Sequence, residues 1–460
     1  MKTRIIVMLS FAAVGLTAAA SDNVPGKPQE GPILLTGGDV YPVSGPAIPG
    51  GQVLFDKGKI VVVGKDVESP SDAKHIDVTG KRVYPGLFAA GSDLGLREIP
   101  SVRGTIDSAE TGTINPNARA EVAINPDSEL IPVARANGVL LNLTVPDGGL
   151  LTGSSAVIQL DGWTWEDLTV KAPAAIHLEW PRMTPSGLRR GGAATGEETS
   201  PAASRGDEQL GAIDKVFSDA RAYLAAKKAA SPSSSGHHQD FDARWDAMVP
   251  LLQRKIPLVV AADEVRQIEA AVAFAARQNV RLVISGGFDA PLAADLLKKH
   301  DVPVIVNGIQ RLPLRRDDPY DSPFTLPQRL HQAGIRFCIT LGARHGASEA
   351  RNLPYHAAVA AAYGLPVDEA LKSITLYPAQ ILGVADRVGS LDNGKDATLI
   401  VTTGDVLEET SNVELAFVQG RQVDLSSKHT RLWEKYREKY RRQGNGKAVA
   451  GEGAQPNIKG

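Results

Sequence analysis

Two aspartates stand where a carboxylate could bind a metal ion or move a proton. Asp93 follows the apolar run 87–90, and Asp263 follows the apolar run 258–262. Carboxylate oxygens are the ligands that hard cations such as Mg²⁺ and Ca²⁺ prefer, and a carboxylate can also accept the proton of a catalytic water. Two carboxylates without a third ligand make a weak cation site. Chemistry at Asp93 and Asp263 therefore needs support from other positions.

Arg344 and His345 form a second candidate pair. They come shortly after another apolar run, residues 335–340. A guanidinium and an imidazole at such a position could contact an anionic ligand. Asp93, Asp263, Arg344 and His345 are thus the candidate catalytic residues.

The remaining reactive side chains predict little chemistry. Cys338 is the only cysteine, so the chain can form neither an intramolecular disulfide nor a cysteine-based zinc site. It lies inside an apolar run, which is typical of a buried, unreactive thiol. His177 lies on a strand-like run and is predicted to be a core or edge histidine. His356 is predicted to be structural, and His237-His238 lies in a Ser/Gly-rich loop.

The elements that must position these residues alternate between strands and helices. Short apolar runs predict strands at 138–146, 257–262, 280–287, 302–306 and 335–340, and helical spacing predicts helices between them, for example at 263–277 and 290–299. This alternation is typical of a parallel α/β barrel, whose functional residues lie at the carboxyl ends of the strands.

Short strands and turns flank this middle part on both sides. On the amino-terminal side, residues 50–64 predict a hairpin that turns at Gly58, and residues 75–84 predict another that turns at Gly80. Near the carboxyl end, residues 389–401 alternate turn and strand, and residues 413–423 predict a hairpin that turns at Gln419-Gly420. We therefore expect a small β module built from both ends of the chain.

Two segments resemble the amidohydrolase superfamily. Residues 83–96 contain Pro85-Gly86-Leu87 and Leu94-Gly95-Leu96, which resemble the family signature Pro-Gly-Leu-Ile-Asp-x-His-x-His followed by Leu-Gly-Leu. Residues 389–397 read Gly-Ser-Leu-x-x-Gly-Lys-Asp-Ala and resemble the element with which the family re-enters its β-sandwich. The resemblance covers residues 33–423 and is to exported, imidazolonepropionase-like members. It implies a (β/α)8 TIM-like barrel with a small β-sandwich from both chain ends.

The family's metal ligands are replaced in this sequence. The resemblance implies a His-x-His pair where the chain has Gly91-Ser92-Asp93, and a His-Ala-His where it has Ala261-Ala262-Asp263. A histidine is expected where the chain has Ser285-Gly286-Gly287, and an aspartate is expected in the segment that follows Thr340. The frame around each position is retained. No metal ligands or cofactor are therefore predicted, and zinc or another divalent metal is expected only if the site has been rebuilt.

Length and composition fit this organisation. The domains expected in the 460 residues are a signal peptide at 1–20, sandwich parts at 21–84 and 385–425, the barrel at 85–384, and a charged helix with a disordered tail at 426–460. A basic start, an apolar run and Ala18-Ala19-Ala20 predict export, which means the periplasm in a Gram-negative cell. The formal net charge of −2 argues against a nucleic-acid partner.

Two functions remain open. A complete relative would be a metal-dependent hydrolase of amide or other C–N bonds in small cyclic or peptide-like substrates. The loss of ligands favours a non-catalytic member, which would bind a small molecule or act as a partner subunit, either with its own copies or with a complete homologue. The alternative is an active hydrolase of C–N bonds whose rebuilt site uses Asp93 and Asp263.

Overall fold

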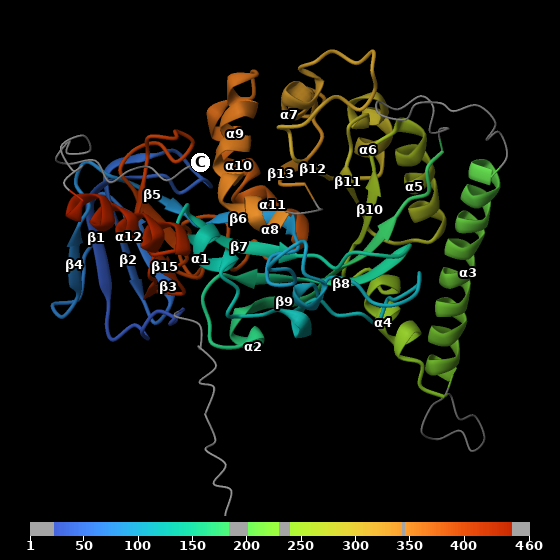
Figure 1. Cartoon of the computed structure of the whole chain (residues 1–460), viewed down its shortest axis with the longest axis horizontal. Coiled ribbons are helices and arrows are strands. Elements are labelled where there is room, and N and C mark those ends of the chain that lie inside the picture. Colours follow the sequence, from blue (N-terminus) through green and yellow to red (C-terminus); the bar gives the residue numbers. More distant parts are fainter. Residues whose placement is uncertain (1–22, 184–200, 230–239, 343–345, 444–460) are drawn as a thin grey trace, which may run out of the picture.

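The computed structural model describes residues 23–183, 201–229, 240–342 and 346–443. Two eight-stranded sheets organise these residues, one built from both ends of the chain and one from its middle. Figure 1 shows the end-derived sheet on the left and the barrel to its right, with the long helix α3 at the far right edge. No helix among the described residues has the length and apolarity that crossing a membrane requires.

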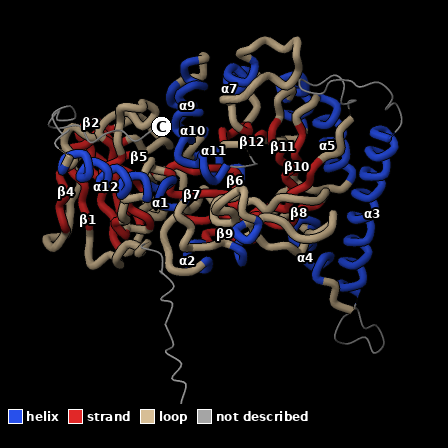
Figure 2. The backbone as a smooth tube through the Cα atoms, viewed as in Figure 1, coloured by secondary structure: helices blue, strands red, loops and turns tan. Residues whose placement is uncertain are grey.

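Figure 2 shows how helices and strands are distributed over the fold. The end-derived sheet contains β1 (Ile33–Val40), β2 (Ile48–Asp56), β3 (Lys59–Gly64), β4 (Lys74–Asp77), β5 (Arg82–Pro85), β14 (Leu399–Thr402), β15 (Val413–Val418) and β16 (Arg421–Gln422). The barrel strands are β6 (Leu87–Ser92), β7 (Val139–Thr144), β8 (Leu151–Gln159), β9 (Thr169–Glu179), β10 (Leu258–Ala262), β11 (Leu282–Gly286), β12 (Val304–Asn307) and β13 (Phe337–Thr340). The α-helices are α1 (Leu130–Arg135), α2 (Trp165–Leu168), α3 (Pro201–Ala229), α4 (Ala243–Leu252), α5 (Val265–Arg277), α6 (Ala294–Lys299), α7 (Ser322–Gln332), α8 (Gly346–Glu349), α9 (Leu353–Ala362), α10 (Val367–Ser373), α11 (Leu376–Leu382) and α12 (Lys428–Arg442).

The end-derived sheet confirms two of the predicted turns and corrects a third. β2 and β3 meet in a two-residue turn at Lys57-Gly58, and β15 and β16 meet at Gln419-Gly420; all four residues have positive φ, as a type I′ hairpin requires. The hairpin predicted around Gly80 is wrong, because β4 and β5 both pair in parallel with β1 and not with each other. The sheet also curls, since Ile60 of β3 exchanges backbone hydrogen bonds with Gly394 and Lys395 just before β14.

The middle of the chain confirms the α/β barrel. Its strands run in the order β6 to β13, and the first and last lie near each other, because the Thr340 hydroxyl donates to the Gly91 carbonyl over 3.2 Å. The expectation that every strand is parallel is wrong at β8, which runs antiparallel to both β7 and β9. The sequence of β8 contains Gly153-Ser154-Ser155, and this polar, small-residue stretch hid a fully buried strand.

Small apolar side chains fill the barrel interior. They form one buried cluster that Ile381 of α11 joins, and its strand residues are Ala90, Ala175, Val259, Val283, Ile305 and Cys338. Cys338 is fully buried, as predicted, and burial raises the pKa of its thiol. The thiol therefore stays protonated at neutral pH and is a poor nucleophile.

A buried ion-pair network joins the barrel to the end-derived sheet. Asp161, just after β8, accepts from Arg135 of α1 at 3.3 Å and from Arg421 of β16 at 3.0 Å. Its Oδ1 also accepts from the Gly26 amide at 3.1 Å. A fully buried carboxylate needs such partners to offset its lost hydration, so this network fixes the two sheets and the amino-terminal segment relative to one another.

The carboxyl-terminal helix α12 forms where a charged helix was expected. None of its residues is buried, and Tyr436 is 46% exposed. Polar contacts hold the helix: Arg431 reaches Glu129 at 3.0 Å, and Nδ1 of His429 lies 2.8 Å from Arg351 Nη1. The predicted signal peptide, His237-His238 and the carboxyl-terminal tail lie outside the described residues.

Candidate functional site at the barrel mouth

Asp93 is held in place immediately after β6. The residue is 2% exposed, and its Oδ2 lies 2.6 Å from Nε of Arg97 in an ion pair. Its Oδ1 accepts from the backbone amide of Ala347 at 3.0 Å. Ala347 belongs to α8, which follows the last barrel strand. The carboxylate thus ties the end of the first strand to the segment after the last one, through a hydrogen bond at Oδ1 and an ion pair, without a hydrogen bond, at Oδ2.

Asp263 is also engaged, by different partners. Its Oδ1 lies 3.3 Å from Nη2 of Arg311 and accepts from the Phe288 amide at 3.3 Å. The Arg311 guanidinium also stands 5.5 Å from the centre of the Phe288 ring. Asp93 and Asp263 are therefore each paired with a different arginine.

The replacement at β11 is physically linked to Asp263. Gly286 has a φ of +100°, and a Cβ added there would lie 2.7 Å from Oδ1 of Asp263. Backbone conformations of this kind favour glycine, and a side chain at this position would also require the Asp263 carboxylate to move. Gly286 and the observed position of the Asp263 carboxylate therefore fit each other.

The other side chains at the strand ends are neutral hydrogen-bonding groups. Asn307 of β12 donates through Nδ2 to the Ser285 hydroxyl at 2.9 Å. Thr340 of β13 bonds to the backbone of β6. Nearby, Arg315 pairs with Asp289 at 3.0 Å, so the loop after β12 neutralises a further carboxylate that follows β11. The described mouth therefore combines arginine-paired carboxylates with uncharged polar groups.

His177 of β9, which the sequence predicts to be a core or edge histidine, faces the barrel interior. Its Cα pairs in register with Val259, and Ala175, two residues earlier, belongs to the interior cluster. Alternation along the strand therefore directs His177 into the barrel. Its Nε2 is buried and has no hydrogen-bond partner among the described residues. Burial lowers the pKa of His177 to about 3, so the ring is neutral at physiological pH.

Three predicted residues remain, namely His356, Arg344 and His345, and the structure describes only the first. His356 of α9 is buried, and its Nδ1 accepts from the Ile309 amide at 3.3 Å, which agrees with the structural role expected. Arg344 and His345 lie outside the described residues, so they remain predictions.

A zinc ion does not fit the described donor set. Zinc sites use thiolate, imidazole and carboxylate ligands in a close cluster, whereas the strand ends here carry Gly91, Ala261 and Ser285 together with two arginine-paired carboxylates. Within the ranges that the structure covers, no three His, Cys, Asp or Glu residues are grouped so as to hold a metal. The geometry thus supports no step that passes through a metal.

Comparison with known proteins finds similarity to amidohydrolases. The sequence model of the amidohydrolase family matches residues 267–423. A solved amidohydrolase from Thermotoga maritima MSB8 superimposes with a TM-score of 0.74 at 27% identity, over 85% of this chain and 99% of that one. Amidohydrolase tasK of Hapsidospora irregularis is 25% identical over an alignment of 393 residues, and the match covers 78% of this chain. The chain therefore has the fold of an amidohydrolase, and its residues 267–423 match that family.

The curated relatives match over limited parts of their own length. The chain spans 38% of Amidohydrolase tasK. An N-acetylglucosamine-6-phosphate deacetylase of Rattus norvegicus is 39% identical over 62 residues, which are 14% of each chain. The activities in these names describe those proteins.

The two aspartates should differ sharply in their contribution to stability. Asp93→Asn leaves the mostly buried Arg97 without its counter-charge, so we expect a loss of about 3–5 kcal/mol in the free energy of unfolding. Asp263 is 26% exposed in its side chain, and Asp263→Asn should cost about 1 kcal/mol or less. Urea unfolding monitored by circular dichroism measures both values. Equal losses in the two variants would contradict a structural role for Asp93.

The buried histidines predict a stability that depends on pH. Burial lowers the pKa of His177 to about 3 and that of His356 to about 4, from about 6.5 in the unfolded chain. The unfolded state therefore binds protons first, and stability that is complete above about pH 6.5 is lost as the pH falls toward these values. Each histidine should cost roughly 1–1.5 kcal/mol between pH 7.5 and pH 5.5, a range in which ordinary carboxylates stay ionised.

Urea unfolding at these two pH values tests the prediction. His356→Asn should remove about half of the pH-dependent loss, whereas the matched change His75→Asn, at an exposed position, should leave it unaltered. A pH dependence that is identical in His356→Asn and the unsubstituted protein would show that His356 does not contribute.

Proposed function

We propose that this chain is a non-catalytic, imidazolonepropionase-like member of the superfamily that binds a small molecule at the barrel mouth. The observation that carries the proposal is the engagement of both candidate carboxylates. Asp93 is paired with Arg97, and Asp263 with Arg311. A carboxylate whose charge is already offset by a neighbouring guanidinium is a poor metal ligand, because the arginine occupies the side from which a cation would be attracted.

The neutral groups at the mouth indicate the ligand's chemistry. His177 offers an uncharged imidazole whose Nε2 is buried, and Ser285 and Asn307 offer a hydroxyl and an amide. A buried polar atom without a partner costs free energy, which a ligand hydrogen bond would recover. An uncharged molecule with amide-like donors and acceptors therefore fits better than a charged one. Such a ligand would resemble the amide-bond substrates of the superfamily, but the protein would bind it without hydrolysing it.

A binding role is compatible with the export and the partners that the sequence predicts. An exported protein without its own chemistry could bind its ligand alone, as a homo-oligomer, or beside a complete homologue that supplies catalysis. Superfamily membership alone leaves the choice among these open, because one fold serves many functions.

One panel of uncharged compounds, namely N-acetylated amino acid amides, cyclic ureides and N-acetylated dipeptide amides, tests binding and catalysis together. We expect at least one compound to raise the melting temperature of the full chain while no compound is hydrolysed, with or without added zinc. His177→Ala should abolish the stabilisation, and the exposed control His75→Ala should retain it. Failure of every compound to stabilise the protein would reject this ligand class.

Turnover would favour the alternative, an active C–N hydrolase with a rebuilt site. In that case a chelator, or the substitution Asp263→Ala, should abolish hydrolysis while the circular dichroism spectrum stays unchanged. Asp263 is the more informative position, because Asp93→Ala is expected to destabilise the fold for structural reasons.

A further inference from the structure

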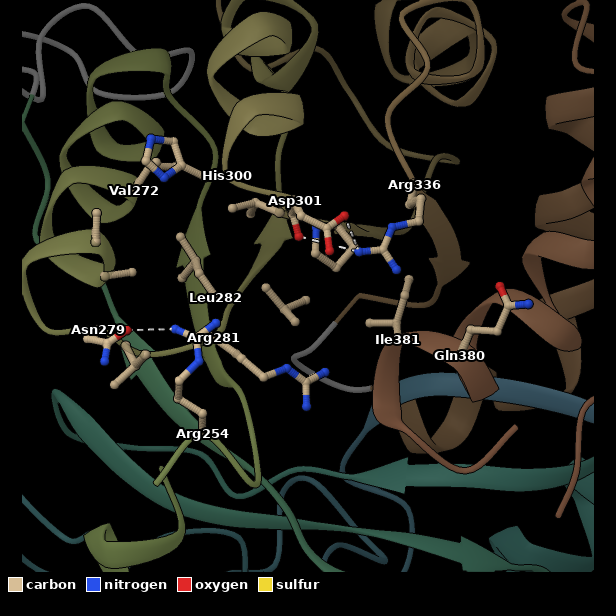
Figure 3. Close-up of a pocket in the computed structure, with 16 residues that line it drawn as sticks. Arg254, Val272, Asn279, Arg281, Leu282, His300, Asp301, Arg336, Gln380 and Ile381 are labelled. Atoms are coloured by element: carbon tan, nitrogen blue, oxygen red, sulfur yellow. Dashed lines mark hydrogen bonds and ion pairs between the residues drawn. The ribbon is translucent and has the colours of Figure 1, made fainter. Parts of the chain in front are cut away.

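A pocket opens at the end of the barrel opposite to the mouth. It has a volume of about 410 Å³ and lies among the segments that lead into β10, β11, β12 and β13 (Figure 3). Arg254, Arg281 and Arg336 line it, each located shortly before one of these strands. Part of its wall is apolar and includes Val283 and Ile381, which also belong to the interior cluster of the barrel.

The positive charges of this pocket are only partly compensated. Asp301 is its sole lining carboxylate among the described residues, and it pairs with Arg336 at 2.6 Å. Arg254 donates to the neutral amide oxygen of Asn279 at 3.0 Å. Figure 3 shows these two contacts as dashed lines, while the Arg281 side chain extends without one. Two guanidinium charges therefore remain without a carboxylate partner among the lining residues.

A further cation lies close to Arg281. Lys171 of β9 donates through Nζ to the carbonyls of Leu382 at 2.8 Å and Gly383 at 3.3 Å. Its pKa is lowered by burial and, to a smaller extent, by the charge of Arg281, while Asp386 acts in the opposite direction. Two like charges are thus held near each other at the base of the barrel, an arrangement that an anion would stabilise.

Three of the residues that line the pocket have the same backbone conformation at the end of a helix. Arg254, Asn279 and Asp301 each follow the last residue that caps a helix, and all have positive φ, at 61°, 48° and 53°. Glycine or asparagine is the usual residue at this position. At Arg254 this backbone conformation is less favourable than it would be for glycine, and it sets the direction in which the arginine side chain leaves the loop.

We infer that this pocket binds a small polyanion that carries phosphate or carboxylate groups. Guanidinium groups match such oxyanions through paired, charge-assisted hydrogen bonds. One anionic group would contact Arg281, and a second would contact Arg254. The apolar wall would cover the carbon skeleton of an organic anion and would stay partly exposed beside an inorganic one. The site lies at the opposite end of the barrel from the mouth, so this inference does not depend on the proposed function.

Isothermal titration of the full chain with inorganic pyrophosphate and, separately, with citrate tests the inference. We expect one or both to bind and to bind more weakly as NaCl is added. Arg281→Gln and Arg254→Gln should each weaken binding by about tenfold or more, because each removes a charge-assisted contact. Preference for pyrophosphate would identify a phosphate-bearing ligand, and preference for citrate a carboxylate-bearing one.

A matched control separates this site from the general charge of the protein. Arg266 lies at the amino-terminal end of α5, away from the pocket, and Arg266→Gln removes the same charge. Its affinity for either anion should equal that of the unsubstituted chain. The inference is overturned if neither anion binds, or if Arg266→Gln loses as much affinity as Arg281→Gln.

Discussion

The ion pair between Asp93 and Arg97 is the interaction on which the barrel mouth depends. A carboxylate that is only 2% exposed is costly unless a charge and a hydrogen-bond donor offset its lost hydration. Arg97 supplies the charge, and the Ala347 amide supplies the donor. Because Ala347 follows the last strand and Asp93 follows the first, satisfying this carboxylate also closes the barrel. Asp93, at a position where the resemblance implied a metal-binding histidine, thus connects the first and last strands of the barrel.

Other carboxylates at the mouth are also balanced by arginines. In a metal site, carboxylates at strand ends are balanced by a dication. Here guanidinium groups of Arg97, Arg311 and Arg315 balance Asp93, Asp263 and Asp289. Gly286 lies against one of these groups, because a Cβ at this position would lie 2.7 Å from Oδ1 of Asp263. Each of the three carboxylates therefore has its own guanidinium partner.

Local patterns predicted much of this structure. Apolar runs marked β7 and β10 to β13, and the turn at Lys57-Gly58 followed from the need for positive φ. Pairing between strands that are distant in the sequence was harder to predict. The turn at Gly80 suggested a local hairpin, whereas β4 and β5 both pair with the distant β1. β8 was missed because its serines and glycine obscure a strand that is buried on both faces.

The site was predictable to a similar degree. Asp93 and Asp263 were found from their places after apolar runs, and Arg97, four residues after Asp93, could have been found from spacing alone. Arg311 lies 48 residues from Asp263, so only the folded chain brings the two together. His177 could have been assigned to the interior by counting two residues from Ala175, once β9 was recognised as a barrel strand.

The most direct test of this account is the metal content of the purified full chain after equilibration with zinc and removal of unbound ion. Mass spectrometry of the digested protein, with a complete metal-dependent amidohydrolase treated in parallel, gives the ratio of zinc to chain. Zinc far below one ion per chain is the predicted result, because arginines already balance the carboxylates at the strand ends. One zinc per chain, retained by the unsubstituted protein and lost in Asp263→Ala, would contradict it.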